Sequence, residues 1–338
     1  MKVVIDAFGG DNAPLSVIKG AELAVKEYGV NIVLTGDEEI IKKCAKDNKI
    51  SLDNIEIRHT SEIFSMHDKP TDIVKSKSGT SLGLALKLVA DGECDAFVSA
   101  GSTGAILAGA TFIVKRIKGV KRPAIGTVIP ARDRKFLLMD MGANADCRPE
   151  MIAQFGVMAS AYMENVMGVK NPEIGLLNIG TEDTKGGTLQ LEAYSLLKNM
   201  PINFIGNVES RDLPVGVCDA VVTDGFTGNI AVKLYEGVAA TMFSMIKDVM
   251  YSKLSYKLAG AVIKPGLAQI KSKADYSEVG GAPLLGIRKP VIKAHGSSNE
   301  IAIKNAVRQA VLFAENDVIG NIAKSLSNTA ENDSPENI

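Results

Sequence analysis

A pattern that occurs twice in the sequence constrains the fold more than any other feature. Residues 92–106 read GECDAFVSAGSTGAI and residues 216–230 read GVCDAVVTDGFTGNI, so both fit G-x-C-D-A-x-V-[ST]-x-G-x-T-G-x-I. In each copy a short apolar run, at 96–98 or 220–222, predicts a buried strand. A Gly/Thr turn then leads into an apolar-periodic segment that predicts a helix. The repeat therefore predicts two strand–turn–helix units, which we expect to contribute neighbouring strands to one sheet.

The two glycine-rich turns are candidates for binding an anion. Unpaired backbone N–H groups and the helix dipole favour negative charge at a helix start, and glycine lets a phosphate approach the backbone. We expect both turns to converge on one anionic ligand, unless the two units merely share efficient turn chemistry. The predicted phosphate-binding residues of these turns are Gly101, Ser102, Thr103, Gly104, Asp224, Gly225, Thr227 and Gly228.

The composition is that of an ordinary globular protein. Of 338 residues, 46% are hydrophobic and 23% are charged, and the formal net charge of −1 removes any global electrostatic case for nucleic acid. The chain has no Trp and no basic run interleaved with aromatic residues, which also argues against base stacking. No uncharged apolar run is long enough to span a bilayer.

Cysteine and histidine usage points away from thiol and metal chemistry. The four cysteines are scattered without C-x-x-C spacing, which suits a reducing cytoplasm, and only three histidines occur, far apart. Neither G-x-G-x-x-G nor a P-loop pattern is present. We therefore expect no metal and no organic cofactor.

Strands and helices alternate along the chain, which predicts an α/β protein with a mostly parallel sheet. We expect one three-layer α/β/α domain over residues 1–326 and a disordered tail over 327–338. Residues 124–130 and 135–139 are close enough to pair antiparallel through a charged turn, and 274–287 reads as a Gly-rich loop. The other expected strands are 3–5, 31–35, 54–58, 96–98, 173–178, 203–206, 220–222 and one before His295, after which Ser297 or Ser298 should cap one long closing helix.

Residues 230–273 predict a helical hairpin that extends beyond the sheet. The pattern is continuously helical from Ile230 to about Lys264, where Pro265 and Gly266 should break it, and a second piece follows at 267–273. We expect the hairpin to pack against a symmetry mate and to carry at its tip apolar residues flanked by lysines, which suit an anionic bilayer unless the dimer buries them. The expected membrane contacts are Leu254, Leu258, Ala259, Val262 and Ile263, beside Lys253, Lys257 and Lys264.

Six loops follow predicted strand ends, where open α/β sheets bind ligands. They lie around Gly10, Gly101, Gly142, Gly180, Gly225 and His295. Asp183 or Thr184 should cap a helix with Lys185 in its first turn, where a cation opposes the helix dipole. The position of Lys185 therefore indicates that this lysine contacts an anion. The alternative is that Lys185 is an ordinary surface residue. Further candidates for substrate contact are Gly9, Gly10, Asp11, Lys75, Lys77, Asn144 and His295, the last of which could equally be structural.

Taken together, these segments resemble the PlsX family of phosphate:acyl-acyl-carrier-protein acyltransferases. The resemblance rests on DAFGGDNAP, IFSMHDKPTDIVKSKSGTS, VSAGSTGA, DMGANADCRPE, NIGTEDTKG, VTDGFTGN and AHGSSN in this order, and runs from Met1 to about Leu326. Phe8 stands where Met is usual and Lys75 where Arg is usual. The resemblance implies an α/β/α fold akin to phosphotransacetylases and isopropylmalate dehydrogenases. It also implies a homodimer that transfers an acyl group from acyl-carrier protein to inorganic phosphate for phospholipid synthesis.

The two template copies differ where chemistry is expected. Asn229 opens the second predicted helix where the first copy has Ala105, so only the second copy offers an amide. The resemblance supports Lys185 and Asn229 as a catalytic pair, with acyl-carrier protein and phosphate as substrates. Expected partners are a second copy, an anionic membrane and the glycerol-phosphate acyltransferase of the pathway. A basic cluster of Arg116, Lys118, Lys121 and Arg122 is a candidate dock for the acidic carrier protein, or a solvated face.

Two other functions compete with this interpretation. A nicotinamide-dependent decarboxylating dehydrogenase would share the fold but would need an acidic metal cluster. Asp6, Asp11, Asp140 and Asp224 do not supply one convincingly, because each is better placed to cap a helix or hold a loop. A non-enzymatic phosphate-sensing scaffold at the membrane is the other alternative.

Overall fold

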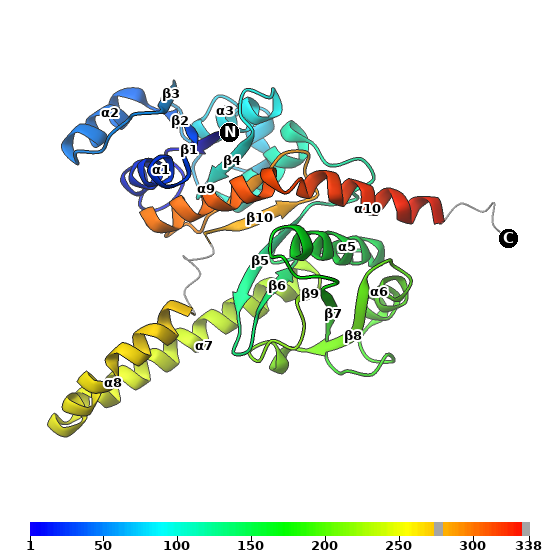
Figure 1. Cartoon of the computed structure of the whole chain (residues 1–338). Coiled ribbons are helices and arrows are strands. Elements are labelled where there is room, and N and C mark those ends of the chain that lie inside the picture. The colour runs from blue at the N-terminus through cyan, green and yellow to red at the C-terminus, as the bar shows by residue number, and fades with distance from the viewer. Residues whose placement is uncertain (274–279, 333–338) are drawn as a thin grey trace.

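The protein has two lobes joined by one continuous sheet, with a helical hairpin projecting from the second lobe (Figure 1). The computed structural model describes residues 1–273 and 280–332. Within them, eleven strands follow the order β3-β2-β1-β4-β11-β10-β5-β6-β9-β7-β8. The strands are β1 Lys2–Asp6, β2 Asn31–Gly36, β3 Ile55–His59, β4 Ala96–Ser99, β5 Ala124–Pro130, β6 Lys135–Met139, β7 Glu173–Asn178, β8 Asn203–Glu209, β9 Ala220–Val222, β10 Ala282–Leu285 and β11 Val291–Lys293.

Helices connect most of these strands. The α-helices are α1 Leu15–Tyr28, α2 Glu38–Asp47, α3 Ser81–Ala90, α4 Thr103–Gly109, α5 Pro149–Asn165, α6 Thr188–Lys198, α7 Gly225–Ser252, α8 Leu254–Lys273, α9 Glu300–Glu315 and α10 Val318–Asn332. Two short 3-10 helices, η1 Pro70–Val74 and η3 Ser210–Asp212, and a π-helix, η2 Ala110–Val114, complete the described elements. Helix α10 thus extends into the predicted tail as far as Asn332, and 333–338 lie outside the described residues. No helix in the described ranges combines the length and apolar character needed to cross a bilayer.

The predicted α/β fold with a mostly parallel sheet is confirmed. Parallel pairs join β3, β2, β1, β4 and β11 in the first lobe, and β6, β9, β7 and β8 in the second. The antiparallel pairs are β11 with β10, β10 with β5, and β5 with β6, so the predicted pairing of 124–130 with 135–139 is also confirmed.

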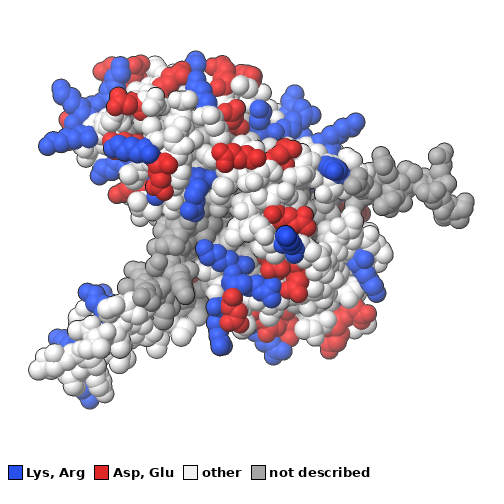
Figure 2. All heavy atoms as spheres, viewed as in Figure 1, with Lys and Arg blue, Asp and Glu red and all other residues white. Residues whose placement is uncertain are grey.

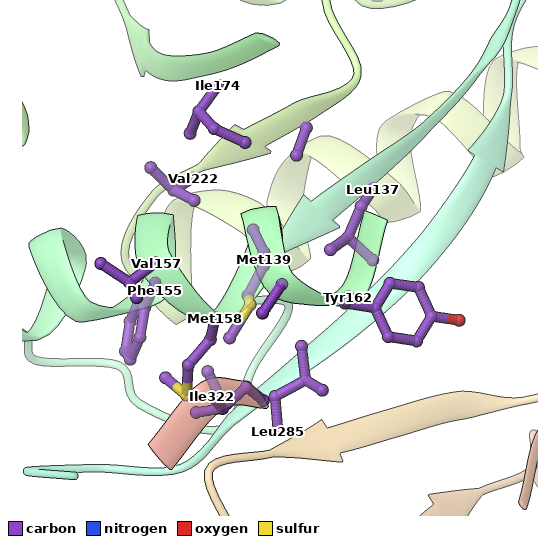
Figure 3. Close-up of a cluster of buried hydrophobic side chains, with 14 of the residues drawn as sticks. Leu137, Met139, Phe155, Val157, Met158, Tyr162, Ile174, Val222, Leu285 and Ile322 are labelled. Atoms are coloured by element: carbon purple, nitrogen blue, oxygen red, sulfur yellow. The ribbon is translucent and has the colours of Figure 1, made fainter. Parts of the chain in front are cut away.

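Alternate strand residues pack against helices on opposite faces of the sheet, as the pleat requires. In β1, Val3 and Ile5 face α1 and α9, whereas Val4 faces α3 and α4. In the second lobe α5 covers one face, and Figure 3 shows Phe155, Met158 and Tyr162 of this helix among side chains of the sheet. The opposite face of that lobe is covered by the first turns of α7, where Val232 is buried. These layers fix the strand ends that carry the candidate site.

The two template copies fold alike, as predicted. Asp95 of the first copy accepts a hydrogen bond from the backbone N–H of Lys2 at 2.7 Å, and Asp219 of the second accepts one from Glu173 at 2.9 Å. Each aspartate therefore holds the first residue of the adjacent strand, β1 or β7. Part of the shared pattern thus has a structural origin.

The prediction that the copies supply neighbouring strands is wrong. Four strands lie between β4 and β9 in the sheet. Because the three antiparallel pairings between them reverse the chain direction, β4 and β9 run in opposite senses. Each copy instead serves its own lobe, since a side chain at Gly104 would meet Pro70 and one at Gly228 would meet Asp140.

The region after the hairpin also differs from expectation. Residues 282–285 form β10 inside the segment predicted as a loop, of which 274–279 lie outside the described residues.

The single long closing helix that was predicted is two helices, α9 and α10. The cap of α9 is Asn299, whose side chain accepts from Ala302 N at 2.9 Å, and not Ser297 or Ser298. An Asn at this position satisfies the helix start as well as a Ser does, so the sequence left the choice open.

The hairpin breaks twelve residues earlier than Pro265. Helix α7 ends at Ser252, Lys253 is extended, and α8 runs from Leu254 with Pro265 inside it. The two helices pack closely near the turn, where a Cβ on Gly260 would lie 2.7 Å from the Met250 methyl. Tertiary packing of α8 on α7 therefore sets the break, and the exposed proline is tolerated within α8.

Candidate active site

The loops that follow β6, β9 and β7 meet at one edge of the second lobe. These strands are mutually parallel, so their carboxyl ends lie together. These loops carry Asn144 and Lys185, and the start of α7, directly after the β9 loop, carries Asn229; all three residues were predicted to contact substrate. The topology therefore brings the predicted catalytic pair to one edge of the sheet.

Asp140 organises the loop after β6. Its fully buried carboxylate accepts from the backbone N–H groups of Ile125 (3.1 Å), Ala143 (3.1 Å) and Asn144 (2.7 Å). The Asn144 side-chain amide donates to the same carboxylate at 2.9 Å and to Pro123 O at 2.8 Å. Burial raises the pKa of Asp140, while these donors act in the opposite direction. Asn144 is thus a bracing residue for this loop in the structure.

The start of α7 is capped from within the protein. Asp224 accepts from Thr227 N at 2.8 Å and from Thr227 Oγ1 at 2.7 Å, and Gly225 N donates to Asn144 O at 2.7 Å. Two of the amides predicted to bind phosphate in the second copy are therefore already bonded. The sequence suggested free donors here, but the Asp224 carboxylate accepts from Thr227 N and the Asn144 carbonyl oxygen accepts from Gly225 N.

Asn229 lies just beyond this cap and faces a cavity of about 280 Å³. Its side chain is half-buried and makes no hydrogen bond with any residue in 1–273 or 280–332. Lys233, one helical turn later, lines the same cavity together with Gly142 and Phe226. Lys233 is not among the residues predicted from the sequence, although its spacing of four residues from Asn229 could have indicated a shared helix face. An amide and a cation are thus presented side by side to solvent-accessible space.

Lys185 lies in a loop and not in a helix. Helix α6 begins at Thr188 with Gly187 as its cap, so neither Asp183 nor Thr184 caps it and the dipole argument for Lys185 fails. Asn178, the last residue of β7, fixes the loop by donating to Lys185 O at 3.0 Å. The Lys185 ammonium is half-exposed and lies 3.9 Å from the Glu182 carboxylate. The backbone of this lysine is anchored while its side chain can reorient.

A second cluster forms at the carboxyl ends of β1, β4 and β11 in the first lobe. Buried Asp6 accepts from Ser99 Oγ at 2.9 Å, and Ser99 Oγ accepts from Gly101 N at 2.9 Å. A Cβ on Gly9 would lie within 2.8 Å of all three of these groups, so the close approach requires glycine there. Asp11 N donates to Gly296 O at 2.8 Å, which ties the predicted loops around Gly10 and His295 together.

The remaining first-lobe candidates lie around this cluster. His295 Nδ1 accepts from Ser297 N at 3.2 Å and lies 2.8 Å from Ser297 Oγ, which suits a structural role for that nitrogen. Lys75 and Lys77 lie after η1, which ends at Val74, and are not part of a helix. Lys77 pairs with Asp68 at 3.6 Å.

Lys293 is a residue of this edge that the sequence analysis missed. It ends β11 beside Ser99, and the strand alternation places its side chain on the same face as Val291, Ser99 and Asp6. Burial lowers the pKa of Lys293, and Glu236 of α7 opposes that shift. No carboxylate in the described ranges lies within ion-pair distance of it. Lys293 could have been predicted as a site residue because it is a polar residue at the end of an otherwise apolar strand, as Asp6 and Ser99 are.

The aspartates weighed for a metal site have structural partners instead. Asp224 caps α7 and Asp140 holds its loop, as the sequence suggested. Among the described residues, no group of three or more His, Cys, Asp or Glu side chains is arranged to hold a metal ion. The dehydrogenase alternative therefore gains no support from the geometry.

Comparison with known proteins identifies the family. Residues 1–321 match the model of the family described as fatty acid synthesis protein. A phosphate acyltransferase of Bacillus cereus is 49% identical over 325 residues, which cover 96% of this chain and 97% of that protein. A phosphate acyltransferase of Alkaliphilus oremlandii is 44% identical, with 98% and 99% covered.

This chain belongs to the phosphate acyltransferase family. Its members are transferases, so the protein is an enzyme of acyl transfer that involves phosphate, and the resemblance to the PlsX family is confirmed. The implied fold is confirmed as well. A phosphotransacetylase of Streptococcus pyogenes superposes with a TM-score of 0.62 at 17% identity, covering 95% of this chain and 94% of that chain. A 4-hydroxythreonine-4-phosphate dehydrogenase of Klebsiella pneumoniae gives 0.53 at 13%, covering 93% and 99%. At such identities the likeness concerns the fold alone.

Proposed function

We propose that this phosphate acyltransferase moves a fatty acyl group from acyl-carrier protein to inorganic phosphate, giving acyl phosphate for phospholipid synthesis. The observation that carries the proposal is the unbonded Asn229 amide, which faces a cavity beside Lys233 at the edge that also carries Lys185. Membership of the phosphate acyltransferase family supports acyl transfer that involves phosphate. The proposal adds acyl-carrier protein as the donor of the acyl group.

The chemistry needs no covalent intermediate. A phosphate oxygen attacks the thioester carbonyl, so a C–O bond forms while the C–S bond breaks, and the departing thiolate takes a proton from solvent. Asn229 is placed to donate to the oxyanion as it develops, and Lys185 to offset the charge of phosphate or thiolate. Burial raises the pKa of Cys94 to about 11 and of Cys218 to about 12, which suits a mechanism without a cysteine nucleophile.

The first-lobe loops are the proposed contacts for the anionic part of the substrates. Ser102 forms no side-chain cap on α4, and within the described ranges the backbone N–H groups of Thr103 and Gly104 have no hydrogen-bond acceptor, unlike those at the start of α7. Gly9, Gly10, Asp11, Lys75, Lys77 and His295 lie on loops or turns near this edge. Asn144, Asp224 and Gly225 act instead by shaping the second-lobe loops.

We infer a homodimer formed along α7. Six apolar side chains spaced three or four residues apart make one stripe along this helix, and each is between 49% and 65% exposed. Such a seam is typical of helices that pack against a partner. Its members are Ile230, Leu234, Val238, Met242, Met245 and Val249.

The hairpin tip is the proposed membrane contact of a cytoplasmic protein. Leu254, Leu258 and Val262 follow at intervals of four and are 76%, 68% and 80% exposed, and Ala259 and Ile263 are exposed beside them. In Figure 2 the visible face of the projecting hairpin shows basic side chains among uncharged ones. Apolar residues flanked by lysines favour an anionic bilayer, which would receive the long-chain product and present the glycerol-phosphate acyltransferase of the pathway. All four cysteines are free thiols, as a reducing compartment requires.

One assay separates this function from its alternatives. The protein is incubated with acyl-carrier-protein thioester and phosphate, without nucleotide, and thiol release is measured. Phosphate-dependent release is the expected result, and neither a dehydrogenase nor a binding scaffold would give it. Absence of release at saturating phosphate and thioester would refute the proposed activity.

A further inference from the structure

A large cavity lies on the other side of the loop that follows β6 from the cavity that Asn229 faces. It has a volume of about 790 Å³ and opens between residues 116–122, which lead into β5, and residues 143–151, which lead into α5. A cavity of this size suits an organic ligand and is far larger than a phosphate ion requires. The sequence grouped part of its wall as a basic cluster but gave no indication of a cavity.

The cavity is lined by four cations and two carboxylates. The cations are Arg116, Lys121, Arg122 and Arg148, and the carboxylates are Asp146 and Glu150. Arg122 and Arg148 form no ion pair within residues 1–273 and 280–332, and Lys121 lies 4.0 Å from Glu150, at the limit for such a pair. Two guanidinium groups are therefore free to bind an anionic ligand, for which their planar, multiply donating geometry is well suited.

Hydrogen bonds within the protein hold the basic wall in place. Gln154 of α5 accepts from Lys121 N at 2.9 Å and donates to Gly119 O at 3.0 Å, so the turn is held against the helix. Arg116 donates to the carbonyl oxygens of Val120 and Lys121, which closes the same turn. A preorganised wall loses little conformational entropy on binding.

The cavity shares a wall with the candidate active site. Ala143 and Asn144 line the basic cavity, while Gly142 and Ala145 of the same loop line the smaller cavity that contains Asn229. A long, flexible arm anchored at the guanidinium groups would therefore cross only one loop to bring its end to the Asn229 amide.

We propose that the basic cavity binds the phosphodiester of the phosphopantetheine arm that carries the acyl thioester. This proposal rests on the proposed function, because it assigns the donor's arm to one side of the 142–146 loop and the attacking phosphate to the other. The cavity's size, its two unpaired guanidinium groups and its position next to Asn229 distinguish this ligand from inorganic phosphate, the other source of the same chemistry. Arg148 joins the site as a residue that the sequence analysis did not identify.

The test compares donors with and without the phosphodiester. Arg122→Ala and Arg148→Ala are each expected to raise KM for the acyl-carrier-protein thioester by about tenfold or more, as loss of a charged contact does, with kcat and KM for phosphate unchanged. Turnover of an acyl-pantetheine thioester, which lacks phosphate, should be the same in wild type and variants. Arg132→Ala is the control, because this exposed arginine pairs with Asp133 beyond the far end of β5.

A binding measurement tests this proposal independently of the proposed catalytic function. Calorimetric titration with phosphopantetheine should show binding that both variants weaken, with pantetheine binding poorly throughout, whether or not the wild type turns over. A rise in KM for phosphate with the donor unaffected would reassign the cavity to inorganic phosphate and overturn the proposal. Unchanged titration and donor KM in both variants would also overturn it.

Discussion

The Asn229 amide packs directly against the backbone of Gly142, and a Cβ built on that glycine would lie 2.9 Å from Asn229 Nδ2. Gly142 also has φ +122°, a conformation that other residues rarely adopt. The conformation of the loop after β6 therefore determines where the Asn229 amide can lie. The proposed catalytic amide can occupy its position because Gly142 has no side chain.

Gly142→Ala should separate catalytic geometry from stability. We expect a loss of about 1–3 kcal/mol in the free energy of unfolding from backbone strain, and a drop in kcat of at least about tenfold from displacement of Asn229. Gly168→Ala is the control, since its φ of +71° is also positive but nothing lies within 4 Å of its added Cβ. The control should lose stability and keep its kcat. Equal kcat values for the two variants would contradict the proposed role of Asn229.

Lys185→Ala and Asn229→Ala should each lower turnover by at least about 100-fold while leaving the fold and the oligomeric state unchanged, because each removes a charge or a hydrogen-bond donor that stabilises the transition state. Lys198→Ala, in the last turn of α6, is the matched control for the lost charge. Steady-state rates at saturating phosphate and thioester provide the measurement. Near-wild-type rates in both variants would show that the catalytic pair is misassigned even within the correct family.

The α7 stripe predicts how the dimer can be broken. Met242→Lys places a charge in the middle of the stripe and should shift the protein to a monomer in light scattering at micromolar concentration. Lys247→Glu, on another face of the exposed helix, should leave the mass unchanged. A dimeric Met242→Lys variant would mean that the apolar stripe is not the interface.

Leu258→Glu tests the membrane contact. The substitution opposes insertion of the tip into an anionic bilayer, so flotation with anionic vesicles should fall by at least about tenfold while the dimer persists. Leu191→Glu, at a 40% exposed position on α6, adds the same charge away from the tip and should float normally. Undiminished flotation of Leu258→Glu would exclude the tip as the contact.

Asp6 predicts a dependence of stability on pH. Burial raises the pKa of Asp6 above its ordinary value of 3.8, so the folded protein holds this proton more tightly than the unfolded chain. Its contribution to stability is therefore complete below the ordinary pKa and is lost as the pH rises through the raised value. Asp6→Asn keeps an acceptor for Ser99, and its free energy of unfolding relative to wild type should increase from pH 4 to pH 7. A difference that is constant with pH would contradict the assignment.

Local features of the fold were predictable because local chemistry determines them. The strand at 220–222 and the antiparallel pair at 124–130 and 135–139 follow from short apolar runs bounded by turns, and all three have the expected bounds. Long-range features were not. The order of β4 and β9 depends on β10, whose residues 282–285 follow glycines that suggested a loop.

The candidate site likewise has features that the local sequence predicts and features that only the folded chain creates. Asn229 could be predicted because the two template copies differ there, and its position at the start of α7 agrees with that prediction. The caps on Gly225 and Thr227 could not, since they depend on Asn144 O and the Asp224 carboxylate reaching those amides in three dimensions. The end of α7 at Ser252 likewise has no sequence signal, because packing at Gly260 and not a local breaker sets it.

The most direct test of the central claim follows both products of one reaction. Purified protein is mixed with acyl-carrier-protein thioester and radiolabelled phosphate in the absence of nucleotide, and free thiol and labelled acyl phosphate are quantified together. The account predicts that the two appear in equal amounts, that both require phosphate, and that Asn229→Ala suppresses both by at least about 100-fold. Thiol release that is independent of phosphate, or the absence of labelled acyl phosphate, would contradict it.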